Sequence, residues 1–201
     1  MTNNIDKIRD LLEFRSDDDF YFLQILQRKK DNKTTNVKVN GSNNNARSIK
    51  VYYVKSLEHF DFIVPEIIEL CKVFGARAGI NLNRRSFKKS ALQHIKKAVD
   101  QVLNNDFKKA HKAYSTVVGA FNNETDKRWI IDIDEEYNAD YAVELMSTIN
   151  DLRPVGDKII ANIPSKSGYH LITRPFQLDE FKRLYPDLDV HKNNPTNCFI
   201  P

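Results

Sequence analysis

The chain has 201 residues, of which 41% are hydrophobic and 29% charged, and its formal net charge is +4. This length suits one large domain or two small ones with an ordinary globular composition. No apolar run approaches the roughly 20 residues that span a bilayer, and the first residues lack a basic and then apolar leader, so we expect a cytoplasmic protein with no membrane partner. Cys71 and Cys198 are too few for a structural zinc site and are expected to be buried, reduced thiols.

The charged residues are unevenly distributed along the chain. Nine basic residues and two acidic ones lie between residues 84 and 112, whereas eight acidic and two basic residues lie between 124 and 144. A basic surface beside an acidic centre suits a polyanionic substrate. The alternative is that the lysines form the solvated faces of amphipathic helices.

The first part of the chain predicts short helices and strands. The elements are a helix over residues 5–15, a strand over 20–28, a polar loop over 30–47 and a returning strand over 49–54. Pro65 is typical of the first turn of a helix and Gly75 of a helix end, so the next helix is expected between them.

Residues 76–83 alternate between polar and apolar types, which predicts a strand with Arg77, Asn81 and Asn83 on one face. That face suits contact with a phosphate or a template, or equally with bulk water. Ser86 is expected to cap the following helix. Its inward apolar stripe is predicted to be Phe87, Ala91, Ile95, Val99 and Val102, and a second helix over 107–118 is predicted to turn Phe107, Ala110, Tyr114 and Val117 inward.

The last third of the chain has the order β-α-β-β-α-β. Strands are predicted over 128–134, 158–163, 169–173 and 188–190, helices over 139–150 and 178–185, and residues 198–200 are expected to extend the same sheet. This order is typical of the ferredoxin-like or RNA-recognition arrangement, in which the first and third strands lie side by side and the fourth flanks the first. We therefore predict an α+β fold, with an N-terminal α/β module (1–125) packed on a ferredoxin-like βαββαβ catalytic module (126–201).

The stretch Trp-Ile-Ile-Asp-Ile-Asp at 129–134 is the most informative in the chain. Side chains alternate along a strand, so Asp132 and Asp134 share one face. Two close carboxylates repel each other, and a divalent cation relieves that repulsion. Hard oxygen ligands suit Mg²⁺ or Mn²⁺. The alternative is an edge strand with a solvated acidic face.

The predicted sheet brings two further sites to these aspartates. Asp189 lies within the short apolar fourth strand, an expensive place for an unpaired charge. Three aspartates can hold two divalent cations about 3.5–4 Å apart, as in-line phosphoryl chemistry requires. His170 on the third strand would then lie beside the metal site. The alternatives are that Asp189 caps a turn and that His170 is a satisfied core residue.

His170 follows the turn Ser165-Lys166-Ser167-Gly168. The turn offers hydroxyls, backbone N–H groups and an ammonium that can cradle phosphates, and its glycine permits close approach of a ligand. His170 could then donate a hydrogen bond to a phosphate oxygen. The alternative for the turn is a simple hairpin.

Three segments together resemble the motifs of the archaeo-eukaryotic primase superfamily, especially its primase-polymerase branch. They are Ile-Asp-Ile-Asp at 131–134, Pro-Ser-Lys-Ser-Gly-Tyr-His-Leu at 164–171 and Leu-Asp-Val at 188–190. The branch has a hydrophobic-Asp-hydrophobic-Asp strand, a Ser/Gly turn ending in histidine, and a hydrophobic-Asp pair. The second segment departs from that pattern, with Lys-Ser in place of glycine or a basic-glycine pair. The resemblance covers roughly residues 126–201.

The resemblance implies a metal-dependent nucleotidyltransferase, a DNA primase or primase-polymerase of replication or repair. It implies that two Mg²⁺ or Mn²⁺ ions bind Asp132, Asp134 and Asp189, and that His170 with Ser165, Lys166 and Ser167 grips the incoming triphosphate. Partners would be a DNA template, nucleoside triphosphates, and a helicase or other replication protein. Two alternatives stay open: a nuclease using the same carboxylates, and a non-catalytic module that binds single-stranded nucleic acid.

Overall fold

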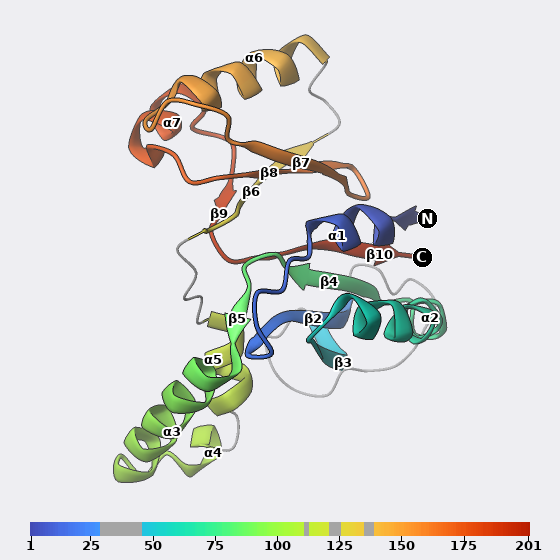
Figure 1. Cartoon of the computed structure of the whole chain (residues 1–201), viewed down its shortest axis with the longest axis vertical. Coiled ribbons are helices and arrows are strands. Elements are labelled where there is room, and N and C mark those ends of the chain that lie inside the picture. Colours follow the sequence, from blue (N-terminus) through green and yellow to red (C-terminus); the bar gives the residue numbers. More distant parts are fainter. Residues whose placement is uncertain (29–45, 111–112, 121–125, 135–138) are drawn as a thin grey trace.

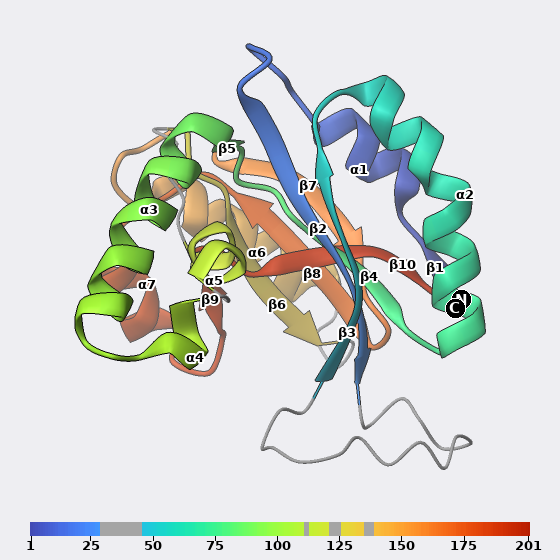
Figure 2. The ribbon, with the colours of Figure 1, turned by 90° about the horizontal axis from the view of Figure 1, so that it is seen from below.

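The computed structural model describes residues 1–28, 46–110, 113–120, 126–134 and 139–201. Over these ranges the chain is a mixed α+β protein with two antiparallel sheets (Figures 1 and 2). No helix in the described ranges is long and apolar enough to cross a membrane. The mixed α+β class predicted from the sequence is confirmed.

The first sheet has the strand order β1-β10-β4-β2-β3, and β5 pairs with β2. Its strands are β1 (Thr2–Asn3), β2 (Asp19–Arg28), β3 (Ala46–Val54), β4 (Arg77–Asn81), β5 (Arg85–Ser86) and β10 (Pro195–Ile200). The predicted strands over 20–28, 49–54 and 76–83 are confirmed within a few residues. Of the predicted loop over 30–47, residues 30–45 lie outside the described residues, and residues 46 and 47 belong to β3.

Helices α1 (Ile5–Leu11) and α2 (Leu57–Phe74) pack against this sheet (Figure 2). The prediction that Pro65 begins α2 is wrong, because the helix begins two turns earlier, at a cap formed by Ser56. The Ser56 side chain accepts a hydrogen bond from the His59 backbone N–H, and Pro65 therefore lies inside the helix. Gly75 ends it as predicted, with a left-handed φ of 54°.

Helices α3 (Phe87–Leu103), α4 (Phe107–Ala110) and α5 (Ala113–Ala120) form an arm that projects away from the two sheets (Figure 1). Ser86 caps α3 as predicted, accepting a hydrogen bond of 3.0 Å from the Lys89 backbone N–H. The predicted inward stripe is wrong for most of its length, because α3 packs on α5 through a different face. Its exposed members are Ala91, Ile95, Val99 and Val102, and Phe107 of the predicted second helix is also exposed.

The second sheet has the order β7-β8-β6-β9. Its strands are β6 (Trp129–Asp134), β7 (Ile159–Pro164), β8 (Gly168–Thr173) and β9 (Val190–His191). One face packs on α6 (Ala139–Asp151) and α7 (Leu178–Leu184). The predicted adjacency of the first, third and fourth strands agrees with this order. The fourth strand begins at Val190, so Asp189 immediately precedes it.

The last strand corrects another expectation. Residues 198–200 do not extend the second sheet, because β10 pairs with β4 and β1 of the first sheet. Residues 195–200, assigned by prediction to the second module, therefore complete the first sheet. The other face of the second sheet shares a hydrophobic core with α1 and α2, to which it contributes Ile130, Ile163 and Ile172.

Candidate active site

The site is built around a facing pair on the two central strands of the second sheet. Asp132 on β6 lies directly opposite His170 on β8 in the antiparallel register. Directly opposed residues project from the same face of a sheet. The His170 Nε2 atom lies 3.5 Å from Asp132 Oδ1, and the two side chains are 14% and 51% exposed. A carboxylate open to solvent thus lies beside a mostly buried imidazole.

The second ring nitrogen of His170 connects this pair to the first sheet. His170 Nδ1 lies 2.8 Å from the hydroxyl oxygen of Thr196, a buried residue on β10. Sequence reasoning did not identify Thr196, because its place beside His170 depends on β10 joining the first sheet. When the Thr196 hydroxyl donates to Nδ1, the remaining N–H of a neutral imidazole is on Nε2, the atom facing Asp132.

Electrostatics favour this neutral form of His170. Burial lowers the pKa of His170 below its ordinary value, and the nearby Asp132 carboxylate opposes that shift. Electrostatic interaction with His191 and Arg28, two further residues missed from the sequence, lowers the same pKa. Arg28 comes from the end of β2, so the first sheet contributes a cation to the surroundings of the pair. The signal for it was an arginine at the end of a strand rich in aromatic and aliphatic residues.

The backbones of the other two predicted metal ligands, Asp134 and Asp189, lie near Asp132, but the three carboxylates do not converge on one point. The Asp132 N–H donates to the carbonyl oxygen of Asp189 at 3.3 Å. The Asp189 carboxylate lies 3.9 Å from the Lys182 ammonium and is 77% exposed. Asp134 is exposed at the end of β6. Nowhere in the described part of the chain are three His, Cys, Asp or Glu side chains placed to hold a metal ion.

The donor set nevertheless fits a hard divalent cation in two respects. Carboxylate oxygens are the ligands that Mg²⁺ and Mn²⁺ prefer. Asp132 and Asp189 lie next to each other across two strands, and Asp134 lies on the same face as Asp132. A three-carboxylate site would require side-chain rotation, chiefly of Asp189 away from Lys182.

The turn before His170 is held tightly against β6. Ser165 N–H donates to the Gly168 carbonyl at 2.8 Å, and Ser167 N–H donates to the Ser165 hydroxyl at 3.4 Å. Gly168 has a φ of 132°, and a Cβ atom there would lie 2.0 Å from the Ile133 carbonyl oxygen. Glycine is therefore required by the approach of the turn to β6, independently of any ligand.

Two predicted phosphate-binding cations line one cavity of about 290 Å³. Lys166 reaches it from the turn of the second sheet, and Arg77 reaches it from β4 of the first sheet. The N-terminal residues Met1 and Thr2 and the C-terminal residues Ile200 and Pro201 also line it. A cavity with two cationic side chains suits an anionic group. Its lining, as far as the chain is described, does not include His170 or the three aspartates.

Several residues of the predicted polar and basic surface are structural instead. Arg85 is 1% exposed and donates to the carbonyl oxygens of Val118 and Asn83 at 2.6 and 2.9 Å. Burial lowers the pKa of Arg85 to about 10. Asn83 donates to the carbonyl oxygens of Arg128 and Lys192. These side chains tie the first sheet to the segments around the second.

Arg84 and Asn81 are likewise buried. Arg84 donates to the Glu13 carbonyl at 2.9 Å, and Asn81 donates to the Asn193 carbonyl at 2.5 Å. Of the polar face predicted over 76–83, Arg77 lines the cavity described above, whereas the Asn81 and Asn83 side chains are buried in hydrogen bonds. Arg84 and Arg85, the two arginines of the expected basic surface over 84–112, are buried rather than part of a surface.

No protein-family model, curated protein or solved structure matches this chain.

Proposed function

We propose that this chain is a metal-dependent nucleotidyltransferase, a small primase-polymerase that makes or extends nucleic-acid strands from nucleoside triphosphates. The observation that carries the proposal is the facing pair of Asp132 and His170, with the Asp189 backbone hydrogen-bonded to Asp132 on the other side. The strand order β7-β8-β6-β9, with an α6 and α7 layer on one face, supports a ferredoxin-like catalytic module.

In this proposal Asp132, Asp134 and Asp189 hold two Mg²⁺ or Mn²⁺ ions. When bound, such ions lower the pKa of an attacking hydroxyl and stabilise charge on a leaving pyrophosphate. In the proposed tautomer the Thr196 hydroxyl donates to Nδ1, and His170 then carries its N–H on Nε2 and donates it to a phosphate oxygen. No protein nucleophile is needed.

The triphosphate is proposed to lie along the turn of residues 165–168. Lys166 and Arg77 line the same cavity and supply positive charge from both sheets. Ser165 and Ser167 add a hydroxyl and backbone N–H groups. The substrate partners are a nucleic-acid template and nucleoside triphosphates, and a helicase or another replication protein is the expected protein partner. The chain is proposed to act in the cytoplasm.

A primer-extension assay tests the proposal. The protein is incubated with a labelled primer annealed to a template, all four nucleotides and Mg²⁺ or Mn²⁺. We expect products longer than the primer, and we expect Asp132→Ala to reduce extension more than about 100-fold because it removes a ligand at the reacting centre. Asp157→Ala, an exposed aspartate on a loop, is the matched control and should keep full activity.

The other outcomes of this assay discriminate between the alternatives. Products shorter than the primer that do not depend on nucleotides would identify a nuclease. Retarded mobility of the primer without any change in its length would identify a binding module. Either result contradicts polymerase activity.

Metal binding has a readout that does not need catalysis. Asp132→Ala should not lower the melting temperature in EDTA, since it removes an exposed carboxylate that shares one face of β6 with Asp134 and loses only a contact to a neutral imidazole. Mg²⁺ or Mn²⁺ should raise the melting temperature of the wild-type chain but not of the variant. A clear drop in EDTA, or an equal rise in both proteins, would contradict the proposed role of Asp132.

A further inference from the structure

A short connection joins the two parts of the candidate site. Residues 192–194 lead from β9 of the second sheet to β10 of the first. Asp189, a proposed metal ligand, precedes this connection, and Thr196, which contacts the imidazole of His170, follows it. The path of residues 192–194 therefore sets where the carboxylate and the partner of the imidazole lie relative to each other.

Asn193, in the middle of this connection, makes hydrogen bonds in three directions. Its Oδ1 atom accepts from Arg85 Nη2 at 3.1 Å, and its Nδ2 atom donates to the Gly119 carbonyl at 2.9 Å. Its own carbonyl accepts from Asn81 Nδ2 at 2.5 Å. A side-chain amide offers an uncharged donor and an uncharged acceptor at a fixed separation, and Asn193 uses both. The connection is thus tied to the first sheet and to the end of α5.

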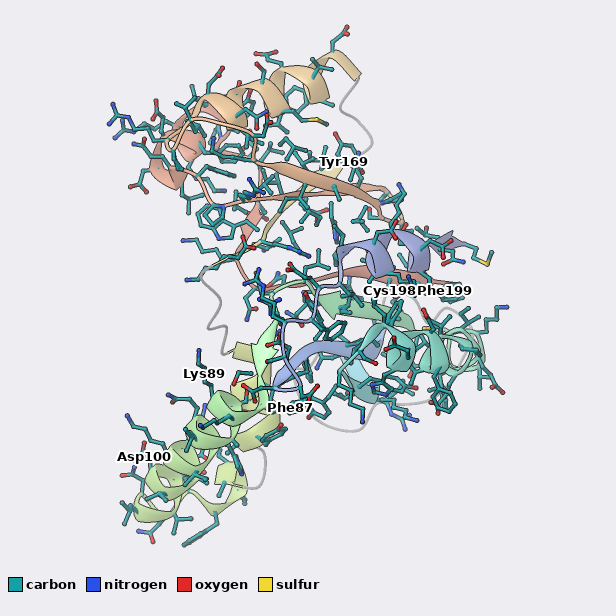
Figure 3. The ribbon with its side chains drawn as sticks, viewed as in Figure 1. Phe87, Lys89, Asp100, Tyr169, Cys198 and Phe199 are labelled. Carbon is teal, nitrogen blue, oxygen red and sulfur yellow. The ribbon has the colours of Figure 1, made fainter. Side chains whose placement is uncertain are left out.

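The partners of Asn193 belong to a packed part of the molecule. The Gly119 carbonyl lies in the last turn of α5, where carbonyl groups have no partner within the helix. Val118 in the same turn is buried in one cluster with Phe20 of β2. Phe87, where the arm meets the first sheet, stacks on the Phe20 ring with 4.3 Å between centroids (Figure 3). The base of the arm therefore gives Asn193 a fixed anchor.

Asn83 holds the same connection at its start. Its Nδ2 atom donates to the carbonyl oxygens of Lys192 at 3.0 Å and Arg128 at 2.9 Å, and its Oδ1 atom accepts from the Arg128 N–H at 2.6 Å. Lys192 directly follows β9 and Arg128 directly precedes β6, so one side chain joins the two paired strands beside Asp132 and Asp189. The hydrogen bonds to residues 192 and 193 thus fix β9 against β6 and the first sheet.

We propose that Asn193 is a positioning residue of the candidate active site. It holds the connection so that Asp189 and Thr196 keep their places beside Asp132 and His170. It acts through the backbone that joins them, and it makes the base of the arm part of the support of the site. The effect on catalysis rests on the proposed function, whereas the effect on the His170 ring does not.

Nitrogen NMR of the histidine rings tests the positioning without any catalysis. Labelled imidazole nitrogens report which of the two carries the proton, and His170→Gln identifies the His170 signals by their loss. At pH 8 we expect one tautomer of His170 in the wild-type chain and a mixture of both in Asn193→Ala, because Thr196 is then no longer held against the ring. Asn194→Ala, at the exposed neighbouring asparagine, is the matched control and should leave the His170 signals unchanged.

Primer extension by the full chain tests the consequence for catalysis. Asn193→Ala should lower kcat about 10–100-fold and change the KM for nucleotides by less than about 3-fold, because a small displacement of reacting groups slows chemistry more than it weakens binding. Asn194→Ala should keep both constants. Circular dichroism checks that each variant is folded. If Asn193→Ala is unfolded, Asn193→Asp takes its place, since it keeps the acceptor for Arg85 and loses the donor to Gly119.

The outcomes separate this proposal from the proposed function. Unchanged His170 signals in a folded Asn193 variant, or the same change in Asn194→Ala, would overturn the positioning role. An active wild-type chain whose Asn193 variant keeps full kcat would overturn it as well. A wild-type chain that extends no primer, but whose His170 signals change in the Asn193 variant alone, would contradict the polymerase and support the positioning.

Discussion

The imidazole of His170 connects the two sheets of the molecule. Its Nε2 atom faces Asp132 in the second sheet, and its Nδ1 atom contacts Thr196 in the first. The contact with Thr196 holds the ring in place, so the Nε2 atom has a defined position facing Asp132. The sequence predicted Asp132 and His170 on neighbouring strands, because the β-α-β-β-α-β order places the first and third strands side by side. It could not predict Thr196, because that contact depends on pairing between β10 and β4, more than 100 residues apart in the chain.

The burial of His170 predicts how stability depends on pH. Because burial holds the pKa of His170 below its ordinary value of about 6.5, the unfolded chain binds this proton more readily than the folded chain. Stability should therefore decrease as the pH falls through about 6.5. Melting temperatures at pH 7.5 and pH 5 should show a larger drop for the wild-type chain than for His170→Gln. An equal drop in both proteins would show that His170 does not carry the effect.

At the scale of single elements, local signals located most strands but misplaced helix α2. Aromatic and branched residues identified β2, which is buried at nearly every position, and alternation identified β4 and the end of β6. For α2 the rule that proline begins helices selected Pro65, whereas the Ser56 cap lies well before it. The burial of Arg84 and Arg85 could not be predicted from the sequence. Their partners include carbonyl groups and a carboxylate that lie far away in the chain. The outward face of α3 could not be predicted, because its apolar stripe has the spacing of an ordinary core helix.

Replacement of Pro65 tests the cost of that proline inside α2. Proline lacks the N–H that would donate to the carbonyl of Asp61 four residues earlier, and its ring crowds the preceding turn. We expect Pro65→Ala to raise the free energy of unfolding by about 1–3 kcal/mol in urea titrations. Lys72→Ala, exposed on the same helix, should change it by less than about 0.5 kcal/mol. A loss of stability in Pro65→Ala would show that the helix requires the proline.

At the scale of the whole molecule, the two sheets form one structural unit. Residues of β2, β4, β6, β7, β8 and β10 contribute to one hydrophobic core together with α1 and α2. Asn4 reinforces this connection, since its amide donates to the carbonyl oxygens of Pro164 and Asn197 at 2.8 and 3.0 Å. The sequence predicted two packed modules, but it could not show that the last strand belongs to the first sheet.

The two cysteines report on the integrity of this shared core. Burial raises the pKa of Cys71 to about 11 and that of Cys198 to about 12, so neither thiol ionises appreciably at pH 8. We expect both to resist a thiol reagent such as 5,5′-dithiobis(2-nitrobenzoic acid) in the native chain and to react together in guanidinium chloride. Rapid labelling of one thiol under native conditions would contradict a single cooperative core.

The position of β10 has a consequence for biosynthesis. This strand pairs on one side with Thr2–Asn3 and on the other with β4, so β1 and β10 are neighbours in one sheet although nearly 200 residues separate them. While the ribosome is still translating residues 195–200, the nascent chain has a vacancy between its first strand and β4. The first sheet stays incomplete until these residues are available, with the edges of β1 and β4 unpaired. A chaperone that shields exposed strand edges would act during that interval.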